Sequence, residues 1–372
     1  MQVGIVGGGQ LGRMLALAGA DLDIRCVTLD PAEDSPASQV APSIVGRYDD
    51  QEALSRLAHG ADAVTYEFEN VPVEAARFLR ERVPVYPPPE ALEVAQDRVA
   101  EKVLFDEVGL PTPSHRAVET LDELTAAVED LGTPVVVKSR RFGYDGRGQA
   151  VIHDAILAED AWRAIGEVPA ILERLVAFDR ELSILGVRGR DGETVFYPLV
   201  ENHHRDGILR YSLAPAPGST ADLQSRAERY ARAVMDRLEY VGVIAIELFQ
   251  AGGELFGNEM APRVHNSGHW TIEGAETSQF ENHLRAVCGI SLGATEVRGA
   301  SLMVNLIGSI PDLGEIAALS GAHLHLYGKT PRPGRKLGHL TLVSEGSEPP
   351  PFEELGRMGV GIPRSPVSRS DA

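Results

Sequence analysis

The sequence predicts an α/β protein, α+β overall, with an N-terminal parallel-sheet domain, a small lid and a C-terminal mixed-sheet domain. Three observations predict this fold class. A glycine-rich turn between a strand and a helix opens the chain, a glycine-rich basic loop joins two strands near residue 145, and a long hairpin spans residues 243–261. With 372 residues, 43% of them hydrophobic, the chain is long enough for two or three domains with real cores.

The composition excludes several functional classes. The formal net charge of −19 argues against a nucleic acid as partner, because binding a phosphate polymer requires a basic surface. Cys26 and Cys288 are too few for a disulfide framework, and neither a leader nor a membrane-length apolar run is visible. We therefore expect a cytoplasmic protein with no membrane partner.

Lysine is depleted, since only four lysines occur among the 35 basic residues. Coding bias toward arginine accounts for the low number of lysines, but it does not explain why lysine is kept at these four positions. A lysine is a compact point charge that the planar guanidinium cannot replace at a tight phosphate or carboxylate site. Lys138, Lys329 and Lys336 are therefore functional candidates, whereas Lys102 lies inside an expected helix, where a structural role is favoured.

The first element is a strand from Gln2 to Val6, followed by G-x-G-x-x-G at residues 7–12 and a helix. Asp30 closes the next strand, Ile24 to Leu29, where a Rossmann-like dinucleotide fold places a ribose-binding acid. The glycines supply only a tight turn and exposed amides at a helix N-terminus, which suit any phosphate. Two interpretations stay open: dinucleotide binding, or a substrate held near Gly9, Gln10 and Leu11.

A buried strand from Ala63 to Tyr66 ends at two acids, Glu67 and Glu69. Acids at the carboxyl end of a parallel strand lie where open α/β sheets bind ligands, although solvated loop acids are the alternative. The proline-rich run 85–89 breaks regular structure, so we place the first domain boundary soon after it. A single helix from Ala91 to Val108 is expected to follow.

The middle of the chain predicts a lid with a phosphate-binding flap. A strand ending at Lys138 leads into the glycine-rich basic loop, and the strand Ala150 to Ile152 follows. Glycines let backbone amides approach phosphate oxygens while Lys138 and Arg147 neutralise charge; an ordinary hairpin is the alternative. The loop is not a Walker loop, which opens a helix with Gly-Lys-Ser/Thr.

Polar residues continue along the strands after the lid. Glu173 and Glu181 lie on two strands and are suited to holding the amine edge and hydroxyls of a nucleoside. His203 and His204 are adjacent, but neighbours in sequence rarely face one ligand, and no further Cys or His cluster completes a zinc set. We expect one histidine near phosphate and the other in a structural role.

The hairpin around Gly253 carries the main candidate site. A turn centred there places Glu247 and Glu259 opposite each other, with Cβ atoms roughly 5 Å apart. Two facing carboxylates repel unless a cation lies between them, and Mg²⁺ takes carboxylate and phosphate oxygens together. An exposed hairpin face with two acids is the alternative. The polar, aromatic segment that follows is interpreted as a wall of the site, formed by Arg263, His265, Asn266 and His269.

A basic cluster lies near the C-terminus of an otherwise acidic chain. Lys329, Arg335 and Lys336 fit a phosphorylated small molecule better than a solvated loop. From about Ser344 the chain is rich in Pro, Ser and Glu with little periodicity, which predicts a mobile tail.

Taken together, these segments resemble the ATP-grasp superfamily and, within it, the 5-(carboxyamino)imidazole ribonucleotide synthase family of purine biosynthesis. The resemblance covers nearly the whole chain. Its motifs lie at residues 7–14 (GGGQLGRM), 142–149 (FGYDGRGQ), 178–183 (FDRELS), 258–271 (NEMAPRVHNSGHWT) and 335–339 (RKLGH). Many ATP-grasp enzymes carry asparagine where this chain has Ala261, so the narrower family fits better than the superfamily in general.

The resemblance implies an ATP- and Mg²⁺-dependent ligase that carboxylates 5-aminoimidazole ribonucleotide with bicarbonate, and a homodimer. It divides the chain into residues 1–97, an ATP-grasp domain at 98–290 with its lid at about 115–175, and a C-terminal domain at 291–372. We assign the Mg²⁺ ligands to Glu247 and Glu259, and catalysis to Lys138, Tyr144, Arg147, Arg263 and His269. ATP contacts are expected at Arg98, Lys138, Gly143, Tyr144, Asp145, Gly146, Arg147, Gly148, Gln149, Glu173, Arg174, Leu175, Val176, Glu181, His204, Asn258 and Glu259. Ribonucleotide contacts are expected at Gly9, Gln10, Leu11, Glu67, Glu69, Tyr144, Arg147, Asn266, Lys329, Arg335 and Lys336.

Three alternative functions share part of this pattern. A formate-dependent ribonucleotide transformylase of the same superfamily has the same ATP-binding parts. An NAD-dependent dehydrogenase accounts for the glycine fingerprint and Asp30 but leaves the flap, the hairpin acids and the lysine cluster without a role. A non-catalytic nucleotide-binding protein is the third alternative.

Overall fold

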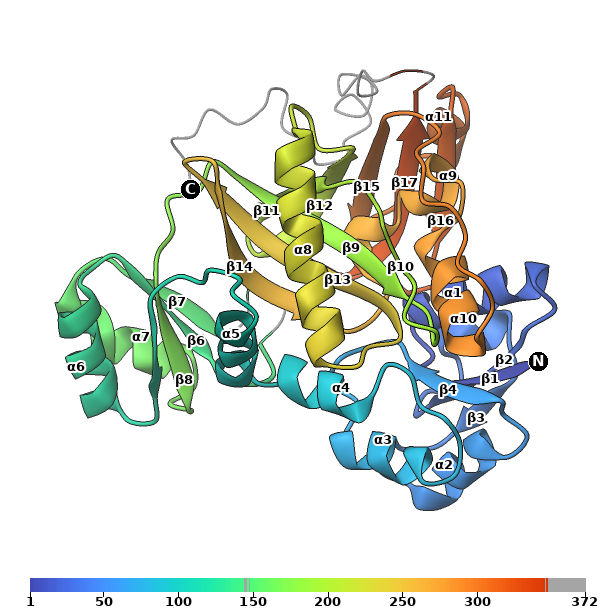
Figure 1. Ribbon diagram of the computed structural model, residues 1–372, viewed down its shortest axis with the longest axis horizontal. Helices are drawn as coiled ribbons and strands as arrows, with labels where there is room; N and C mark the ends of the chain where they lie inside the picture. Colours follow the sequence, from blue (N-terminus) through green and yellow to red (C-terminus); the bar gives the residue numbers. More distant parts are fainter. Residues whose placement is uncertain (144–145, 147, 345, 347–372) are drawn as a thin grey trace.

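The computed structural model describes residues 1–143, 146, 148–344 and 346 of the chain. Its strands form three sheets (Figure 1). A four-stranded sheet lies in the N-terminal region, a second four-stranded sheet forms a lid on the opposite side, and a nine-stranded sheet lies between and above them. The α/β class, with its parallel N-terminal sheet and separate lid, is confirmed. Tyr144, Asp145 and Arg147 of the expected flap, and the expected mobile tail from residue 347, lie outside the described residues.

The N-terminal sheet is parallel, in the order β3-β2-β1-β4. Its strands are β1 (Gln2–Val6), β2 (Arg25–Asp30), β3 (Ser43–Val45) and β4 (Ala63–Tyr66). The helices of this region are α1 (Gln10–Asp21), α2 (Gln51–Ala58), α3 (Val73–Arg80) and α4 (Pro89–Ala95). Because the strands are parallel, the turn after β1 and the acids after β4 meet at one edge of the sheet, as expected.

The single helix expected from Ala91 to Val108 is instead two helices, α4 and α5 (Arg98–Glu107). Asp97 interrupts the helix because its backbone is extended and its side chain accepts hydrogen bonds from the amides of Val99 and Ala100. This is an N-cap, the preferred use of aspartate at a helix start. The break lets α5 run in its own direction along the edge of the central sheet (Figure 1).

The lid is a small antiparallel sheet in the order β5-β8-β6-β7, covered by two helices. Its elements are β5 (His115–Val118), α6 (Leu121–Leu131), β6 (Val135–Ser139), β7 (Gln149–Ile152), α7 (Ala158–Ala164) and β8 (Ala170–Arg174). The lid has its own hydrophobic core, which includes Leu124, Val137 and Trp162. An independent core allows this unit to move as a body relative to the central sheet.

The central sheet runs β14-β13-β9-β11-β12-β15-β17-β16, and β10 pairs with β9. Its strands are β9 (Arg180–Arg188), β10 (Thr194–Phe196), β11 (Val200–Arg205), β12 (Ile208–Ala214), β13 (Gly242–Ala251), β14 (Glu254–Ala261), β15 (Ser301–Ile307), β16 (Ala322–Leu326) and β17 (Lys336–Val343). The C-terminal strands thus continue the sheet formed by β9 to β14 through the pairing of β15 with β12. Neighbouring strands in this sheet are antiparallel.

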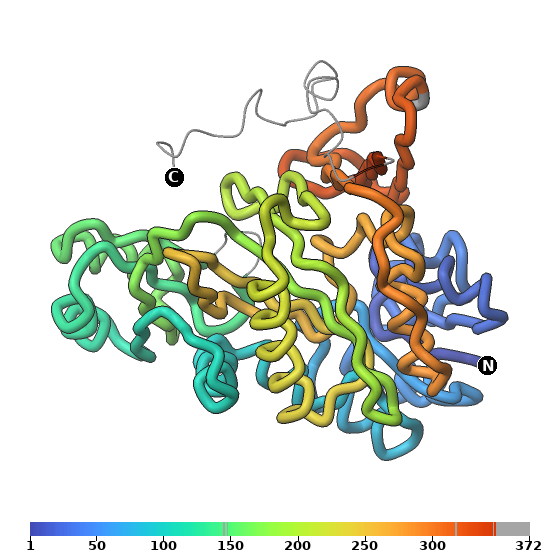
Figure 2. The backbone as a smooth tube through the Cα atoms, turned by 45° about the horizontal axis from the view of Figure 1, so that its top comes forward, coloured from blue at the N-terminus to red at the C-terminus, as the bar shows by residue number. Residues whose placement is uncertain are grey.

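Helices cover the central sheet and join it to the N-terminal domain. Helix α8 (Ala221–Arg237) packs on the sheet, with Ala227, Ala231 and Val234 buried as the helical spacing predicts. Helix α10 (Gln279–Cys288) packs between the central sheet and α1, next to the short helix α9 (Thr271–Gly274), while α11 (Leu313–Ala317) precedes β16. One core cluster therefore contains residues of both domains, among them Leu15 and Leu284. Figure 2 shows the N-terminal segment lying against this part of the molecule.

None of the helices in the described ranges has the length and apolar character needed to cross a bilayer.

Candidate active site

Glu247 and Glu259 face each other across the hairpin of β13 and β14. They are direct partners in the strand register, as the sequence predicted, and the register shifts just after Glu247. The shift is a β-bulge, a feature that often re-aims side chains beside functional sites. The hairpin therefore brings two carboxylates to one point on the sheet.

The two carboxylates differ in their surroundings. Glu259 accepts a hydrogen bond from Arg98 Nη1 at 2.9 Å. Burial acts to raise its pKa, but Arg98, Lys138 and His265 together outweigh burial and lower the pKa of Glu259 to about 2. Burial and the neighbouring Glu259 raise the pKa of Glu247 to about 7. A second charge at Glu247 is therefore disfavoured without a cation, and two such carboxylates suit Mg²⁺ bound together with phosphate oxygens. No group of three or more His, Cys, Asp or Glu side chains suited to a metal ion occurs among the described residues.

Lys138 lies beside this pair, at the end of lid strand β6. Its Nζ is 2.9 Å from Glu173 Oε2 and 3.5 Å from Asn258 Oδ1. Lys102 Nζ lies 3.6 Å from the other oxygen of Glu173 and donates to the carbonyl oxygens of Gly257 and Asn258 at 3.2 and 2.6 Å. Glu173 thus lies between two lysines and is only 2% exposed. Its expected contact with a nucleoside stays a prediction.

Three side chains of α5 bind one short stretch of β14. Arg98 binds Glu259, Lys102 binds the two carbonyls before it, and Glu101 accepts from the amide of Met260 at 2.6 Å. Positions 98, 101 and 102 share one helix face because residues three and four apart are neighbours on a helix. Glu101 was not among the predicted site residues, and a structural role was favoured for Lys102. Both belong to a buried charged network beneath the paired carboxylates.

The described part of the flap packs beside the β11–β12 turn. The backbone of Gly146 has a φ of +76°, and a Cβ there would come within 3.1 Å of Asp206 O. Gly148 O accepts from the amide of Ser139 at 2.7 Å, which joins the far end of the loop to β6. Gly143 and Gln149 bracket the loop. Glycine is thus required at residue 146 both for its conformation and for its close approach to the turn.

The expected adenosine contacts lie at the end of β8 and in the residues directly after it. Leu175 is exposed and Val176 half-buried, while the guanidinium of Arg174 is turned back to the carbonyl of Leu131 at 2.9 Å. Farther along, Glu181 is hydrogen-bonded to His204. Although burial acts against it, this partner raises the pKa of His204 to about 9, so the imidazole is cationic near the paired carboxylates at neutral pH. A cationic His204 is suited to a phosphate.

The glycine-rich turn of the N-terminal domain is already filled by the protein's own carboxylates. Glu67 accepts from the amides of Gly9 and Gly12 at 2.6 and 2.7 Å. Asp30 accepts from the amide of Gly8 and from the hydroxyl of Tyr48, both at 2.8 Å. These are the donors and the acid that a dinucleotide would use, so the dehydrogenase interpretation is not supported. Leu11, expected at the ribonucleotide, is buried in the core.

The C-terminal basic cluster lies against the same edge of the N-terminal sheet. Lys329 Nζ donates to the side chain of Gln10. Burial, then Arg335 and Lys336, lower the pKa of Lys329 to about 8, while Glu67 acts to raise it. Lys336 also lies close enough to Glu247 to act on its pKa. Residues separated by more than 300 positions in sequence, such as Gln10 and Lys329, thus converge beside the paired carboxylates.

The segment after β14, predicted to form a wall of the site, places its two histidines in different surroundings. Arg263 is paired with Glu69 and donates to the carbonyl of Val264, and Asn266 exchanges hydrogen bonds with Asn305. His269, predicted as catalytic, is only 1% exposed and packs against Phe280 and His339. His265, absent from the predicted catalytic set, is the histidine whose Nε2 lies 3.4 Å from Glu247 Oε1.

Chain direction explains this difference. His265 lies in the extended segment that follows β14, whereas His269 lies after the short 3-10 turn Asn266–Gly268, and its ring is buried. No residue pattern in the sequence distinguishes the two histidines.

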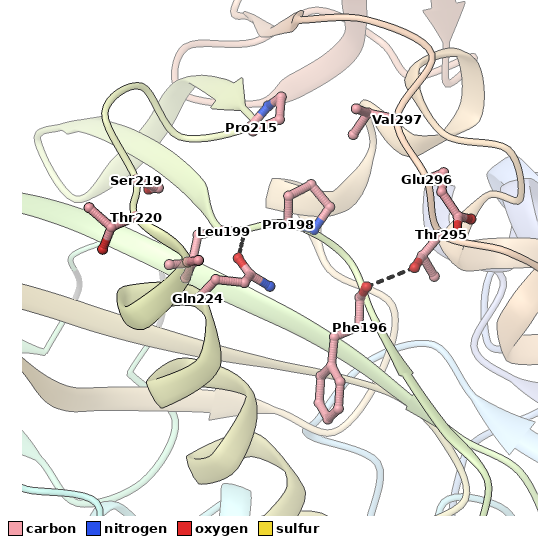
Figure 3. A pocket seen from close by; sticks show the side chains of 11 residues that line it. Phe196, Pro198, Leu199, Pro215, Ser219, Thr220, Gln224, Thr295, Glu296 and Val297 are labelled. Atoms are coloured by element: carbon pink, nitrogen blue, oxygen red, sulfur yellow. Dashed lines mark hydrogen bonds between the residues drawn. The ribbon is translucent and has the colours of Figure 1, made fainter.

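A separate hollow of about 610 Å³ lies on another part of the surface (Figure 3). Its wall includes Phe196, whose carbonyl accepts from Thr295, and Leu199, whose amide binds Gln224. None of the residues predicted for the site is among those that line it. The chemistry-bearing side chains are therefore gathered elsewhere, between lid, hairpin and N-terminal domain.

Comparisons with known proteins agree with this geometry. Residues 1–96 match the ribonucleotide synthetase preATP-grasp domain, residues 103–280 the ATP-grasp domain, and residues 301–349 the phosphoribosylaminoimidazole carboxylase C-terminal domain. The chain is 51% identical to an N5-carboxyaminoimidazole ribonucleotide synthase of Pseudomonas aeruginosa over 92% of this chain and 94% of that protein.

Solved structures give the same result. The N5-carboxyaminoimidazole ribonucleotide synthetase of Thermus thermophilus superposes with a TM-score of 0.91 at 54% identity, covering 96% of this chain and 98% of that one. The Aspergillus clavatus enzyme, solved with ADP and 5-aminoimidazole ribonucleotide, gives a TM-score of 0.87 at 33% identity, covering 93% and 94%.

The lid, the glutamate hairpin and the matched domains define an ATP-grasp protein, an ATP-dependent ligase. Within that class, the chain belongs to the N5-carboxyaminoimidazole ribonucleotide synthase family.

Proposed function

We propose that this protein carboxylates the exocyclic amine of 5-aminoimidazole ribonucleotide with bicarbonate, converting ATP to ADP and phosphate, in purine biosynthesis. The observation that carries the proposal is the convergence of the Glu247–Glu259 pair with Lys138 on one side and the Lys329–Lys336 cluster on the other. One side of the carboxylates suits a triphosphate, and the other suits a ribonucleotide phosphate. Relatives that carry this name, and a relative solved with ADP and the same ribonucleotide, support it.

The chemistry explains why both halves are needed. Bicarbonate is a poor electrophile, so it is first phosphorylated by ATP to carboxyphosphate, which the amine then attacks. Bound Mg²⁺ would be held by Glu247 and Glu259 and would offset charge on the transferred phosphoryl group. Lys138, Arg98 and His204 supply cationic groups at the phosphates, and lid closure excludes water that would hydrolyse the acyl phosphate.

The residues of the wall orient the second half-reaction. Arg263 is held by Glu69, so its planar guanidinium is presented in one orientation to an oxyanion. Lys329, Arg335 and Lys336 hold the ribonucleotide phosphate, and Gln10 holds Lys329 in place. Nothing in the site requires a covalent nucleophile, so positioning of the reactants is the main contribution. The protein acts on small molecules in the cytoplasm, as a homodimer.

The test is ADP release from ATP and Mg²⁺, with and without 5-aminoimidazole ribonucleotide, in bicarbonate-depleted and bicarbonate-supplemented buffer. We expect release that requires the ribonucleotide and rises with bicarbonate. Release that ignores bicarbonate but rises with formate would assign the chain to a transformylase activity. Absence of any release would support a non-catalytic nucleotide-binding protein.

A further inference from the structure

A row of buried polar side chains crosses the central sheet and ends at His265. Ser212 on β12, Asn202 on β11 and Ser183 on β9 lie on successive strands, and Ser267 follows in the segment after β14; each is at most 4% exposed. Ser183 is also the register partner of Glu247 on β13. Buried hydroxyls and amides are costly unless they are hydrogen-bonded, and these form one continuous chain.

The distances define the chain. Ser212 Oγ lies 2.8 Å from Asn202 Oδ1, and Asn202 Nδ2 lies 3.1 Å from Ser183 Oγ. Ser183 Oγ lies 2.8 Å from Ser267 Oγ, which in turn lies 2.9 Å from His265 Nδ1. On the opposite side of the ring, Nε2 faces Glu247 at 3.4 Å. The chain therefore connects the sheet interior to the ring of His265 on the side away from the site.

A backbone hydrogen bond fixes the direction of the hydrogen bonds in this chain. The backbone N–H of Ser267 can only donate, and it points at His265 Nδ1 from 3.4 Å. Nδ1 is therefore an acceptor and carries no proton, so the Ser267 hydroxyl donates to it as well. Ser267 Oγ then accepts from Ser183, Ser183 accepts from the amide group of Asn202, and Asn202 Oδ1 accepts from Ser212. Every group in the chain is satisfied when all the protons point toward Nδ1.

The backbone of His265 is fixed as firmly as its ring. Gln279, which is fully buried at the start of α10, accepts from the His265 amide at 2.9 Å and donates to the His265 carbonyl at 2.7 Å. The ring therefore has one position and, with Nδ1 accepting, its proton lies on Nε2. Within the described part of the chain, this proton faces Glu247 and the space beside it.

We propose that Ser267, Ser183 and Asn202 are positioning residues that hold His265 in the neutral Nε2–H tautomer. His265 then acts as a fixed hydrogen-bond donor to an oxygen anion bound beside Glu247, and not as a general base. This inference rests on the proposed function for the nature of the anion, a carboxylate or phosphoryl oxygen of the reactants. The tautomer itself depends only on the protein.

The direct test is a long-range proton–nitrogen correlation spectrum of the free enzyme labelled with ¹⁵N-histidine, with His265→Gln identifying the signal. We expect a pyridine-type shift for Nδ1 and a pyrrole-type shift for Nε2. The reverse pattern, or two pyrrole-type nitrogens, would overturn the proposal. Because no substrate is present, this result is independent of the ADP-release assay, so either the tautomer or the function can fail alone.

Variants of the chain provide a second test. Ser183→Ala leaves His265 and its direct partner in place but removes the hydroxyl that orients Ser267. The Ser267 backbone N–H remains, but at 3.4 Å it is a weaker donor to Nδ1 than the Ser267 hydroxyl at 2.9 Å. We therefore expect the spectrum to show a second tautomer and kcat to fall about tenfold, which corresponds to the loss of about one net hydrogen bond. Ser301→Ala is the matched control, because Ser301 is equally buried and its hydroxyl makes no hydrogen bond among the described residues. If Ser183→Ala and Ser301→Ala gave the same spectrum and the same kcat, the positioning role would be refuted.

Discussion

Glu67 accepts a hydrogen bond from the backbone amide of Gly9 at 2.6 Å, and its second oxygen binds the amide of Gly12. The carboxylate thus satisfies donors at the start of α1 that have no partner within the helix. A glycine-rich turn that is typical of phosphate sites is here closed by a side chain from the neighbouring strand. These hydrogen bonds link the end of β4 to the turn that follows β1 in the N-terminal domain.

Replacing Glu67 tests this link. In Glu67→Gln, the amide NH₂ faces one backbone N–H, so a charged hydrogen bond is lost, and we expect the free energy of unfolding to fall by about 1–3 kcal/mol. Urea denaturation followed by circular dichroism measures it. Glu74→Gln is the control, since Glu74 is 82% exposed in a surface ion pair with Arg77, worth at most about 1 kcal/mol. An equal loss in both variants would contradict the link.

Glu259→Gln tests the assignment of the metal ligands. The variant removes a charge from the pair and leaves Arg98 without its carboxylate partner, so we expect ADP release to fall at least about 100-fold with the fold intact. Steady-state kinetics at several Mg²⁺ concentrations measures the effect. Glu254→Gln, on the same strand but 67% exposed beside Arg226, should keep the wild-type rate. A Glu259→Gln enzyme with a near-normal rate would rule out this residue as a metal ligand.

Glu247→Gln is expected to stabilise the metal-free protein at high pH. The pKa of Glu247 is raised to about 7, so its charged form is disfavoured in the folded state. The native carboxyl therefore costs stability progressively as pH rises from about 4.5 to about 7. The variant should gain about 3 kcal/mol at pH 8 and almost nothing at pH 4.

Denaturant titrations at both pH values, in the presence of a chelator, measure this difference. Adding Mg²⁺ and ADP should stabilise the wild type more than the variant, because a bound cation offsets the repulsion. A gain of the same size at pH 4 and pH 8 would show that repulsion at Glu247 is not its cause.

Lys102→Met is expected to be strongly destabilising, even though lysine and methionine are similar in length. The ammonium group is buried, donates to two β14 carbonyls and neutralises part of Glu173. Its removal leaves a buried carboxylate and two acceptors under-compensated, a loss of about 3–5 kcal/mol. Chemical denaturation measures it, and adding Glu173→Gln to the variant should recover part of the loss. A loss below about 1 kcal/mol would contradict the network.

Sequence reasoning predicted the hairpin because alternation and a double glycine are local signals, and the Glu247–Glu259 register followed from the turn position. It joined α4 and α5 into one helix because apolar spacing continues through residue 97, and a capping aspartate resembles any other polar position. The direction in which the chain turns after a strand is not a local signal, so His265 and His269 could not be distinguished. The filling of the glycine turn by Glu67 depends on two strand ends meeting in space.

The contact between Lys329 and Gln10 joins positions 319 residues apart. During synthesis the N-terminal domain and the ATP-grasp domain emerge from the ribosome well before Lys329, so a nascent chain has its nucleotide-binding parts without the proposed ribonucleotide cradle. A truncated product of translation would lack the same cradle. The proposed ribonucleotide cradle therefore forms only in molecules that have been translated at least as far as Lys329.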